Sequence, residues 1–535
     1  ALLRFFVKPN DADIVKEKEK TIHKLENNVD NNGDSEKPKR AYNIGQLIGL
    51  FLGPLAFIFV YFFFKPADLS QEGLAVLAST VWIAIWWITE ALPIPVTSLM
   101  PFILFPITGG MDVNATASSY GSETIFLFMG GFMIALAIEK WNLHRRIALG
   151  IIKLIGTNTN RIVLGFMVAT GFLSMWISNT AAAMMMVPMA LAITYQLADA
   201  LKNDPTVDTS PENFGFGKAL MLSIAYSASL GGIATLIGTP PNALLAGAVK
   251  ELYGVEISFF QWMLIGVPFA WLLLFAAWLY LVKIAYPTKI KEFPGGKAVI
   301  EEELRKLGKT SYEEKAVLVI FSLTALAWIL RSFVIQKYIP GIQDGIIAII
   351  GAALLFVIPA KNKEGDRLLD WNTAVKLPWG ILLLFGGGLA IAAGFSSSGL
   401  SQWVGQRLSV LEGVNIILMI LAVSILVNIL TEVTSNTATA SMMIPIIAGL
   451  ALALNVHPYA LLLASTISAS TAFMLPVATP PNAVVFGSGY LRIPDMVKAG
   501  FIVNIFSVML LVLMIYFLVP LVWGIDLSVF PEAFK

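Results

Sequence analysis

A polar motif that occurs twice in an apolar background constrains this fold more than any other feature of the sequence. Ser178-Asn179-Thr180 recurs 257 positions later as Ser435-Asn436-Thr437. A second motif, Thr239-Pro240-Pro241-Asn242, recurs 240 positions later as Thr479-Pro480-Pro481-Asn482. Similarity at a nearly constant offset indicates an internal structural repeat. Paired polar, helix-breaking motifs at matching positions are typical of a transporter whose site lies between its two repeats.

The composition places the chain in a membrane. Of its 535 residues, 57% are hydrophobic and only 13% are charged, and the mean hydropathy is +0.76. Soluble domains carry about 25% charged residues, so the sequence predicts an integral membrane protein. The absence of cysteine excludes disulfides and thiolate metal sites. Three scattered histidines are too few for a histidine-based metal centre.

The first 42 residues differ in kind from the rest. They are rich in Lys, Glu, Asp and Asn and contain few large apolar residues after Val7. A segment of this composition cannot bury a core. We therefore predict a largely disordered cytoplasmic tail over residues 1–42.

Apolar stretches of about 20 residues predict the membrane-spanning helices. The fold class that they predict is an all-α polytopic membrane protein with about 11 transmembrane helices and two re-entrant helical hairpins. The expected spans are 43–64, 74–92, 94–108, 123–140, 219–249, 261–282, 316–334, 343–359, 378–399, 458–487 and 500–521. The expected hairpins are 161–200 and 414–455, each with Ser-Asn-Thr between two apolar arms, and the Thr-Pro-Pro-Asn motifs interrupt 219–249 and 458–487.

The distribution of basic residues predicts the orientation. With the N-terminus inside, 30 of the 36 Lys and Arg residues fall on the cytoplasmic side, which agrees with the positive-inside rule. The C-terminus is then extracellular, and an odd number of crossings makes the two repeats inverted. The predicted organisation is a first transmembrane helix and first repeat (43–282), a cytoplasmic linker (283–315) and a second, inverted repeat (316–535).

A helix broken inside the membrane exposes backbone groups that lipid cannot satisfy, so they must face protein or a ligand. Carbonyl oxygens at the end of one half suit a cation such as Na⁺, and N–H groups at the start of the next half suit a carboxylate. Ser174 lies one helical turn before Ser178, and Thr431 lies one turn before Ser435. Proline leaves the carbonyls of Gly238 and Ala478 free at the two breaks.

No Lys or Arg occurs in either hairpin tip or either Thr-Pro-Pro-Asn break. A dianion buried there without positive charge would be very costly, so bound cations are expected to compensate it. A single Ser-Asn-Thr would more often serve helix–helix hydrogen bonding, and only its duplication favours a site. The glycines at 130–131 and 386–388 are expected to serve close helix packing. Glu432 can bind a cation or proton, or pair with a neighbouring helix.

On these residues the chain resembles the divalent anion/sodium symporter family, most closely its Gram-positive bacterial sodium–dicarboxylate symporters. The resemblance rests on the paired motifs and covers nearly everything after the tail. It also includes the stretches 86–91, 237–242, 377–380 and 431–437. It implies a homodimer in which each protomer has a scaffold domain and a mobile, elevator-type transport domain.

The resemblance also implies a set of site residues. The first Na⁺ site would use Ser174, Ser178, Asn179 and Gly238. The second would use Thr431, Thr434, Asn436 and Ala478. Substrate carboxylates would meet Asn179, Thr180, Asn436 and Thr437, with Thr479 and Pro480 lining the pocket. Position 434 is Thr where its repeat mate is Ile177, so the two cation sites need not have equal affinity.

The leading functional hypothesis is a secondary active transporter that imports C4-type dicarboxylates (succinate, malate, fumarate) with Na⁺. The alternative is a dicarboxylate exchanger, for example of 2-oxoglutarate against malate or succinate, without net Na⁺ coupling. The motifs do not separate these behaviours. An enzyme is not expected, since His-Glu-x-x-His and Gly-x-Gly-Asp are absent. The expected setting is a bacterial plasma membrane, and the expected partners are substrate, sodium ions, lipid and a second copy of the chain, with no nucleic acid.

Overall fold

The computed structural model describes residues 42–156, 158–202, 207–287, 296–362, 365–411 and 413–534. The predicted tail lies outside these ranges except for Tyr42, so its disorder stays a prediction. All the named elements are helices. Within the described ranges, ten helices are long and apolar enough to cross a membrane. The predicted helical membrane fold is confirmed.

The first half contains helices in the predicted spans and two, α6 and α8, that lie outside them. Its helices are α2 (Ile44–Ile58), α3 (Gln71–Thr89), α4 (Ile94–Thr97), α5 (Met100–Thr108), α6 (Val113–Ser119), α7 (Glu123–Lys140), α8 (Leu143–Ile155), α9 (Thr159–Ser174), α10 (Asn179–Ala200), α11 (Gly215–Ile233), α12 (Pro240–Tyr253) and α13 (Phe259–Tyr280). Two of them continue as single π-helical turns, α2 into η2 (Phe59–Phe63) and α13 into η3 (Leu281–Ala285).

The second half repeats much of this order. Its helices are α14 (Gly296–Lys306), α15 (Tyr312–Leu330), η4 (Arg331–Ile335), α16 (Gln336–Tyr338), α17 (Asp344–Val357), α18 (Trp371–Ala374), α19 (Trp379–Ser397), α20 (Leu400–Leu408), η5 (Ser409–Leu411), α21 (Ile416–Thr431), α22 (Asn436–Ala453), α23 (Pro458–Ala469), α24 (Pro480–Phe486), α25 (Ile493–Leu513), η6 (Met514–Leu518), α26 (Val519–Trp523) and η7 (Glu532–Phe534).

Local sequence explains where several helices begin. The Ser70 hydroxyl accepts a hydrogen bond from Gly73 N at 2.9 Å at the start of α3, and Ser258 does the same for α13. Such caps satisfy N–H groups that have no partner within the helix. The expected single span 94–108 is instead two helices, α4 and α5, separated at Ser98 and Leu99.

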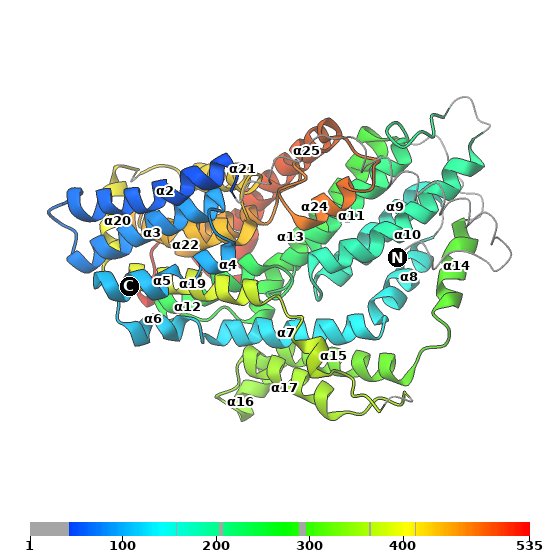
Figure 1. Ribbon diagram of the computed structural model, residues 1–535, viewed down its shortest axis with the longest axis horizontal. Coiled ribbons are helices and arrows are strands. Elements are labelled where there is room, and N and C mark those ends of the chain that lie inside the picture. The colour runs from blue at the N-terminus through cyan, green and yellow to red at the C-terminus, as the bar shows by residue number, and fades with distance from the viewer. Residues whose placement is uncertain are drawn as a thin grey trace, which may run out of the picture.

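The helices form an elongated body whose two ends contain different elements (Figure 1). Helices α2, α3, α20 and α22 lie at one end, and α8, α9, α10 and α14 lie at the other. The long helix α7 runs along one side, and α15 and α17 pack against it. Helix α14 gives the expected linker a folded portion, which contacts α8 through the ion pairs Arg145–Glu303 and Lys153–Glu301.

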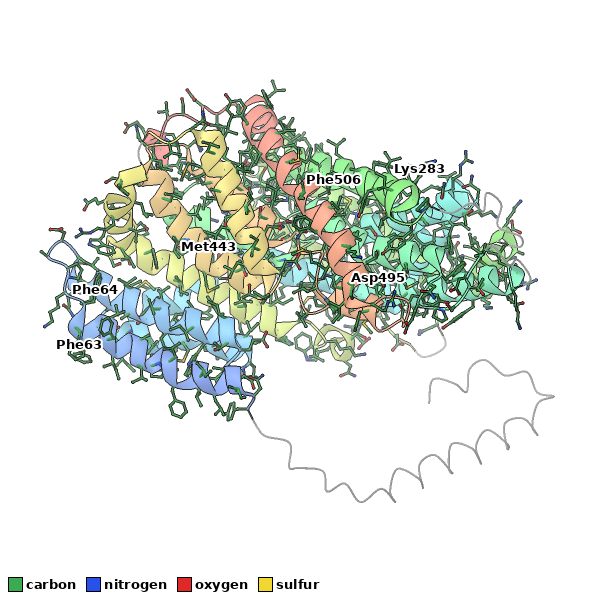
Figure 2. All side chains as sticks on the ribbon, turned by 90° about the horizontal axis from the view of Figure 1, so that it is seen from above. Phe63, Phe64, Lys283, Met443, Asp495 and Phe506 are labelled. Atoms are coloured by element: carbon green, nitrogen blue, oxygen red, sulfur yellow. The ribbon has the colours of Figure 1, made fainter. Side chains whose placement is uncertain are left out.

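The outer surface is apolar where a membrane would cover it. Phe63 lies at one edge of the molecule in Figure 2 and is 72% exposed. Phe51, Leu55 and Phe59 on the same helical segment are also more than half exposed. A helix that shows large apolar side chains outward is typical of a segment in contact with lipid.

Glycines allow the helices of the interior to approach closely, as the sequence predicts. A Cβ atom on Gly130 would lie 2.6 Å from the backbone of Ala348. One on Gly387 would overlap the backbone of Ser98. Close approach through glycine is the main way in which membrane helices pack tightly.

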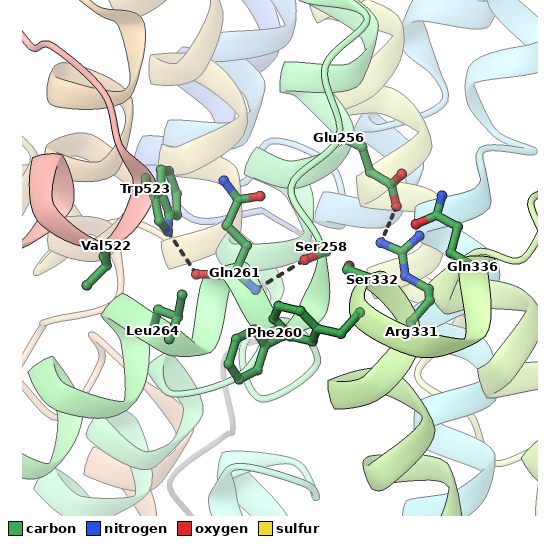
Figure 3. Close-up of a pocket in the computed structure, with 11 residues that line it drawn as sticks. Glu256, Ser258, Phe260, Gln261, Leu264, Arg331, Ser332, Gln336, Val522 and Trp523 are labelled. Atoms are coloured by element: carbon green, nitrogen blue, oxygen red, sulfur yellow. Dashed lines mark hydrogen bonds and ion pairs between the residues drawn. The ribbon is translucent and has the colours of Figure 1, made fainter.

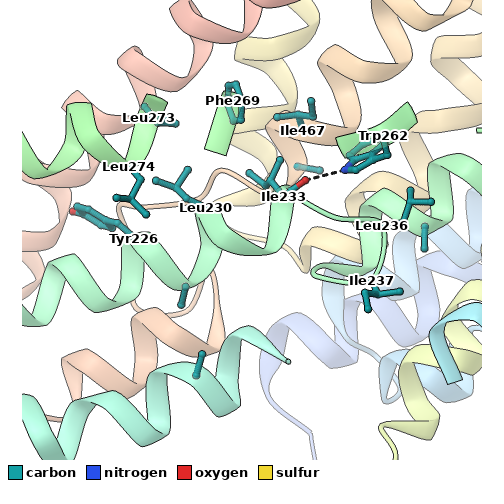
Figure 4. Packing of buried hydrophobic residues seen from close by; sticks show 14 of the residues in the cluster. Tyr226, Leu230, Ile233, Leu236, Ile237, Trp262, Phe269, Leu273, Leu274 and Ile467 are labelled. Atoms are coloured by element: carbon teal, nitrogen blue, oxygen red, sulfur yellow. Dashed lines mark hydrogen bonds between the residues drawn. The ribbon is translucent and has the colours of Figure 1, made fainter. Parts of the chain in front are cut away.

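Helix α11 forms the centre of the core (Figure 4). Its side chains Tyr226 and Leu230 are fully buried and face the apolar residues of α13. The indole of Trp262 donates to Ile233 O at 2.9 Å, at the last residue of α11. The end of this helix is therefore fixed by both apolar packing and a hydrogen bond.

A buried ion cluster fixes the outer end of α15 (Figure 3). Arg331 is 1% exposed. Its guanidinium lies 2.7 Å from Glu256 Oε1 and 2.7 Å from Asp344 Oδ1. The second oxygen of Asp344 accepts from Phe259 N at 2.8 Å. Arg331 thus connects the loop before α13 to the start of α17, beside a cavity of about 350 Å³.

Replacement of Arg331 should destabilise the protein strongly. Arg331→Leu leaves Asp344 buried without its cation, and breaking such a pair costs about 3–5 kcal/mol. The thermal unfolding midpoint of the purified protein in detergent should fall well below that of wild type. The matched control is Lys337→Leu, since Lys337 is exposed. Equal midpoints for Arg331→Leu and its control would show that the cluster contributes nothing to stability.

Candidate functional site

Both hairpin tips and both helix breaks meet around one cavity of about 550 Å³. Ten of the residues that the sequence singles out line it. They are Ser178, Asn179, Thr180, Gly238, Thr434, Asn436, Thr437, Ala478, Thr479 and Pro480. The remaining two, Ser174 and Thr431, are fully buried behind the tips.

The hairpin tips form because each Ser-Asn-Thr begins a new helix. Helix α9 ends at Ser174 and α10 starts at Asn179, where Ser178 Oγ accepts from Ala181 N at 3.1 Å. Helix α21 ends at Thr431 and α22 starts at Asn436. Ser, Thr and Asn favour such positions because their side chains compete for local backbone groups. Helices α9 and α10 lie within the segment 159–200, and α21 and α22 within 416–453; their re-entrant course in the membrane stays a prediction.

Equivalent hydrogen bonds hold the two tips to the two broken helices. Ser174 Oγ lies 2.6 Å from Ala228 O and 2.5 Å from Asn179 Oδ1. Thr431 Oγ1 lies 2.7 Å from both Ala469 O and Asn436 Oδ1. A hydroxyl carries one proton and can donate to only one of its two acceptors. With both amide oxygens pointing inward, each tip has two oxygen–oxygen contacts but only one hydroxyl proton to form a hydrogen bond.

The Asn179 amide shows what these oxygens can accommodate. The amide atom that points inward lies 3.1 Å from Gly238 O, 3.2 Å from Ala228 O and 2.5 Å from Ser174 Oγ. With nitrogen in this position, the amide donates to these oxygens. With oxygen there, four oxygen atoms converge, which is the kind of ligand that a small hard cation requires. The orientation of this one amide therefore decides whether the tip presents a hydrogen-bond donor or four oxygen atoms to its centre.

Two asparagines that the sequence analysis did not assign to the site hold the breaks open. Asn242 Nδ2 donates to Thr235 O at 2.7 Å and to Gly232 O at 3.0 Å. Asn482 Nδ2 donates to Leu475 O at 2.9 Å and to Ala472 O at 3.2 Å. These carbonyls lie at equivalent positions of the two repeats. The repetition of Asn as the last residue of each Thr-Pro-Pro-Asn motif was the signal that could have revealed this role.

The starts of three helices give the cavity an electropositive side. Helices α10, α12 and α22 begin at Asn179, Pro240 and Asn436, all of which line it. Free N–H groups at the starts of α10 and α22 favour an anion, whereas α12 begins with Pro240 and Pro241, which have no N–H group, and adds only its dipole. The hydroxyl of Thr434, a predicted ligand of the second cation, contacts Leu430 O at 2.8 Å and Thr439 Oγ1 at 2.6 Å.

The opposite wall of the cavity comes from elements that the motifs do not mark. Residues of α3, α4, α7 and α19 and their ends supply it: Glu90, Ile94, Pro95, Phe132, Pro378, Gly380, Ile381 and Leu384. Glu90 caps α3 in a left-handed conformation, at φ 49°. Its carboxylate is the one charged group among the lining residues of this cavity. A bound anion would thus receive no positive side chain from the cavity wall.

Membrane helices that end and restart around one cavity are typical of transport proteins. The family model described as "Sodium:sulfate symporter transmembrane region" matches residues 46–524. The chain belongs to this family. The predicted resemblance to sodium symporters is therefore confirmed, and the family description names sodium as the coupled ion.

Curated relatives agree with this assignment. The chain is 50% identical over 498 residues to a protein of *Staphylococcus saprophyticus* named sodium-dependent dicarboxylate transporter SdcS, covering 92% of this chain and 95% of that one. The protein of the same name from *Staphylococcus aureus* is 50% identical over 495 residues, with the same coverage. Both are similar to this chain over nearly their whole length.

Two solved structures share the fold at low sequence identity. The YdaH transporter of *Alcanivorax borkumensis* has a TM-score of 0.53 and 12% identity, covering 85% of this chain and 99% of that one. MtrF of *Neisseria gonorrhoeae* has a TM-score of 0.51 and 12% identity, covering 89% and 95%. At this identity the likeness concerns the fold alone.

Loss of either bracing asparagine should weaken the folded state. Asn242→Ala or Asn482→Ala leaves buried carbonyls at a break without donors, at a cost of about 1–3 kcal/mol. The unfolding midpoint of each purified variant should fall. Asn114→Ala is the control, because Asn114 is exposed. Unchanged midpoints in both variants would show that the breaks persist without these side chains.

Proposed function

We propose that this protein is a secondary active transporter that imports C4-type dicarboxylates together with Na⁺ across a bacterial plasma membrane. The observation that carries this proposal is the pair of equivalent oxygen clusters beside helix starts that face one cavity. A cation and an anion can then bind next to each other, and each lowers the cost of burying the other. The names of the staphylococcal relatives support both the ion and the substrate class.

The first cation would bind at the first hairpin tip. Ser174, Ser178 and Asn179 would offer side-chain oxygens, and Gly238 would offer its carbonyl. The Asn179 amide oxygen is one of these ligands when it points inward. In that position it lies 2.5 Å from Ser174 Oγ and 3.1 Å from the Gly238 carbonyl oxygen. The proposed second site is its repeat mate, formed by Thr431, Thr434, Asn436 and Ala478.

The dicarboxylate would lie between the two tips. Its carboxylates would meet Asn179 and Thr180 on one side and Asn436 and Thr437 on the other, with Thr479 and Pro480 beside them. The helix starts at these residues provide N–H groups, and the two cations neutralise the charge that no cavity side chain balances. The proposed cations are therefore part of the substrate site and do not only drive its movement.

An elevator motion would carry this site across the membrane. Helices α9–α13 and α21–α25 would form the moving unit of the two inverted repeats, and the remainder would form the scaffold and the homodimer contact. The ion pair between Lys218 and Asp495, at 2.8 Å, supports one moving unit because it joins α11 of one repeat to α25 of the other. The cavity adjoins the ends of α3 and α19 near the basic segment 361–376.

A second candidate uses the same cavity. An exchanger of dicarboxylates, for example 2-oxoglutarate against malate or succinate, would need the same anion-binding helix starts. The oxygen clusters favour symport, because an exchanger without net Na⁺ coupling has no need of two cation sites at equivalent positions.

Uptake into proteoliposomes separates the two functions. We expect labelled succinate to accumulate in empty vesicles under an inward Na⁺ gradient and not under an equal K⁺ gradient, because Na⁺ supplies the missing charge. Accumulation that requires internal dicarboxylate, whatever the cation gradient, would instead establish exchange. Protein-free vesicles give the background.

Substitutions at the tips test the site assignment. Asn179→Ala and Asn436→Ala should reduce succinate uptake to background while the protein still inserts, because each removes an oxygen ligand. Thr180→Val and Thr437→Val should raise the KM for succinate more than the Na⁺ requirement. Thr194→Val is the matched control, since the Thr194 hydroxyl bonds only within α10, to Ala190 O. Wild-type uptake in either Asn variant would refute the assignment.

A further inference from the structure

The two repeats use different means to hold their tips against their broken helices. In the first repeat, α9 and α11 touch through glycines. A Cβ atom on Gly231 would overlap the carbonyl group of Gly171. The position 257 residues after Gly171 is Asn428, and the position 240 residues after Gly231 is Thr471. Asn428 Nδ2 donates to Thr471 O at 2.6 Å, so a hydrogen bond replaces the glycine contact.

The second broken helix also ends earlier. Helix α11 remains helical to Ile233, whereas α23 ends at Ala469, four residues short of the equivalent position. The chain beyond it must find other partners for its backbone N–H groups, because neither lipid nor helix satisfies them. One side chain provides most of them.

That side chain is Glu432, which is 2% exposed. Its carboxylate accepts from the backbone N–H groups of Phe473 at 2.8 Å, Met474 at 3.1 Å and Leu475 at 3.2 Å. Asn504 of α25 donates to it at 2.7 Å. The repeat mate of Glu432 is Met175, which has no polar side-chain atom of this kind.

No Lys or Arg of the described residues forms an ion pair with Glu432, and its hydrogen-bond donors are uncharged N–H groups. A buried charge held only by neutral donors is costly unless something else compensates it. Thr431, the preceding residue, is a proposed ligand of the second cation. Leu475, at the end of the held segment, lies three residues before Ala478, whose carbonyl is another.

We propose that Glu432 is a positioning residue for the second cation site, with Asn428 as its partner in a polar clamp on residues 471–475. The clamp fixes the unwound segment so that the Ala478 carbonyl faces the tip, and its negative charge favours a cation beside Thr431. The first cation site does not depend on a charged side chain in this way, because close packing between glycines fixes the helix break in its repeat. The inference rests on the proposed Na⁺ coupling and deepens it, since it makes the two cation sites physically different.

The test measures Na⁺ dependence in three variants. Glu432→Gln keeps the volume but removes the charge and places an NH₂ group toward the N–H donors. The Na⁺ concentration for half-maximal succinate uptake should rise roughly tenfold or more, and the Hill coefficient for Na⁺ should fall. Asn504→Ala should shift the Na⁺ requirement in the same direction by a smaller factor. Met175→Leu, at the repeat mate, should leave it unchanged, since the substitution conserves volume.

Uptake at saturating Na⁺ separates positioning from a general structural defect. In Glu432→Gln it should recover to within about twofold of wild type, because a charge-dependent loss of cation affinity is overcome by mass action. Equilibrium binding of ²²Na⁺ to the purified protein, without substrate, should show fewer ions bound per protomer at low Na⁺ in this variant.

The outcomes are distinct. An unchanged Na⁺ requirement in Glu432→Gln, or a loss of uptake that saturating Na⁺ does not restore, overturns the inference. If Glu432→Gln does not yield folded protein, Asn504→Ala provides the test. An unchanged Na⁺ requirement in Asn504→Ala then overturns the inference. Wild-type uptake that is indifferent to Na⁺ would instead overturn the proposed coupling itself.

Discussion

The structure depends on one constraint: backbone groups released where a helix breaks inside a membrane must be satisfied by the protein or by what it binds. Four helices of this chain end and restart around one cavity, and each break has its own partners. Ser174 and Thr431 contact break carbonyls from the hairpin tips, and Asn242 and Asn482 hold the unwound turns from within. The backbone groups that these contacts leave without partners face the cavity, so oxygen atoms lie there beside the starts of helices.

In the proposed function, this arrangement accounts for anion binding at a site without basic side chains. Helix starts attract the carboxylates only modestly, and Glu90 adds negative charge to the lining. Cations bound at the tips are the remaining source of compensation. Binding of the anion and the cations would then be mutually dependent, and mutual dependence is what thermodynamic coupling requires. In this proposal the coupling originates in the electrostatics of the site, and the movement of the domain transmits it.

The repeats show that equivalent positions need not be built in the same way. Their tips, breaks and bracing asparagines correspond residue by residue. Around this common frame, close glycine packing in one repeat is replaced by the polar side chains Asn428 and Glu432 in the other. The change allows α23 to end earlier than α11.

The sequence by itself determined the helical membrane fold and the family, and it predicted where the helices around the cavity end and restart. These depend on proline, on short polar motifs and on apolar length, all of which act within a few residues. Only the tertiary structure decided which carbonyl each hydroxyl meets, which residues such as Phe132 and Ile381 close the cavity, and what Glu432 contacts. Those partners lie tens to hundreds of residues apart, and their pairing depends on how whole helices pack.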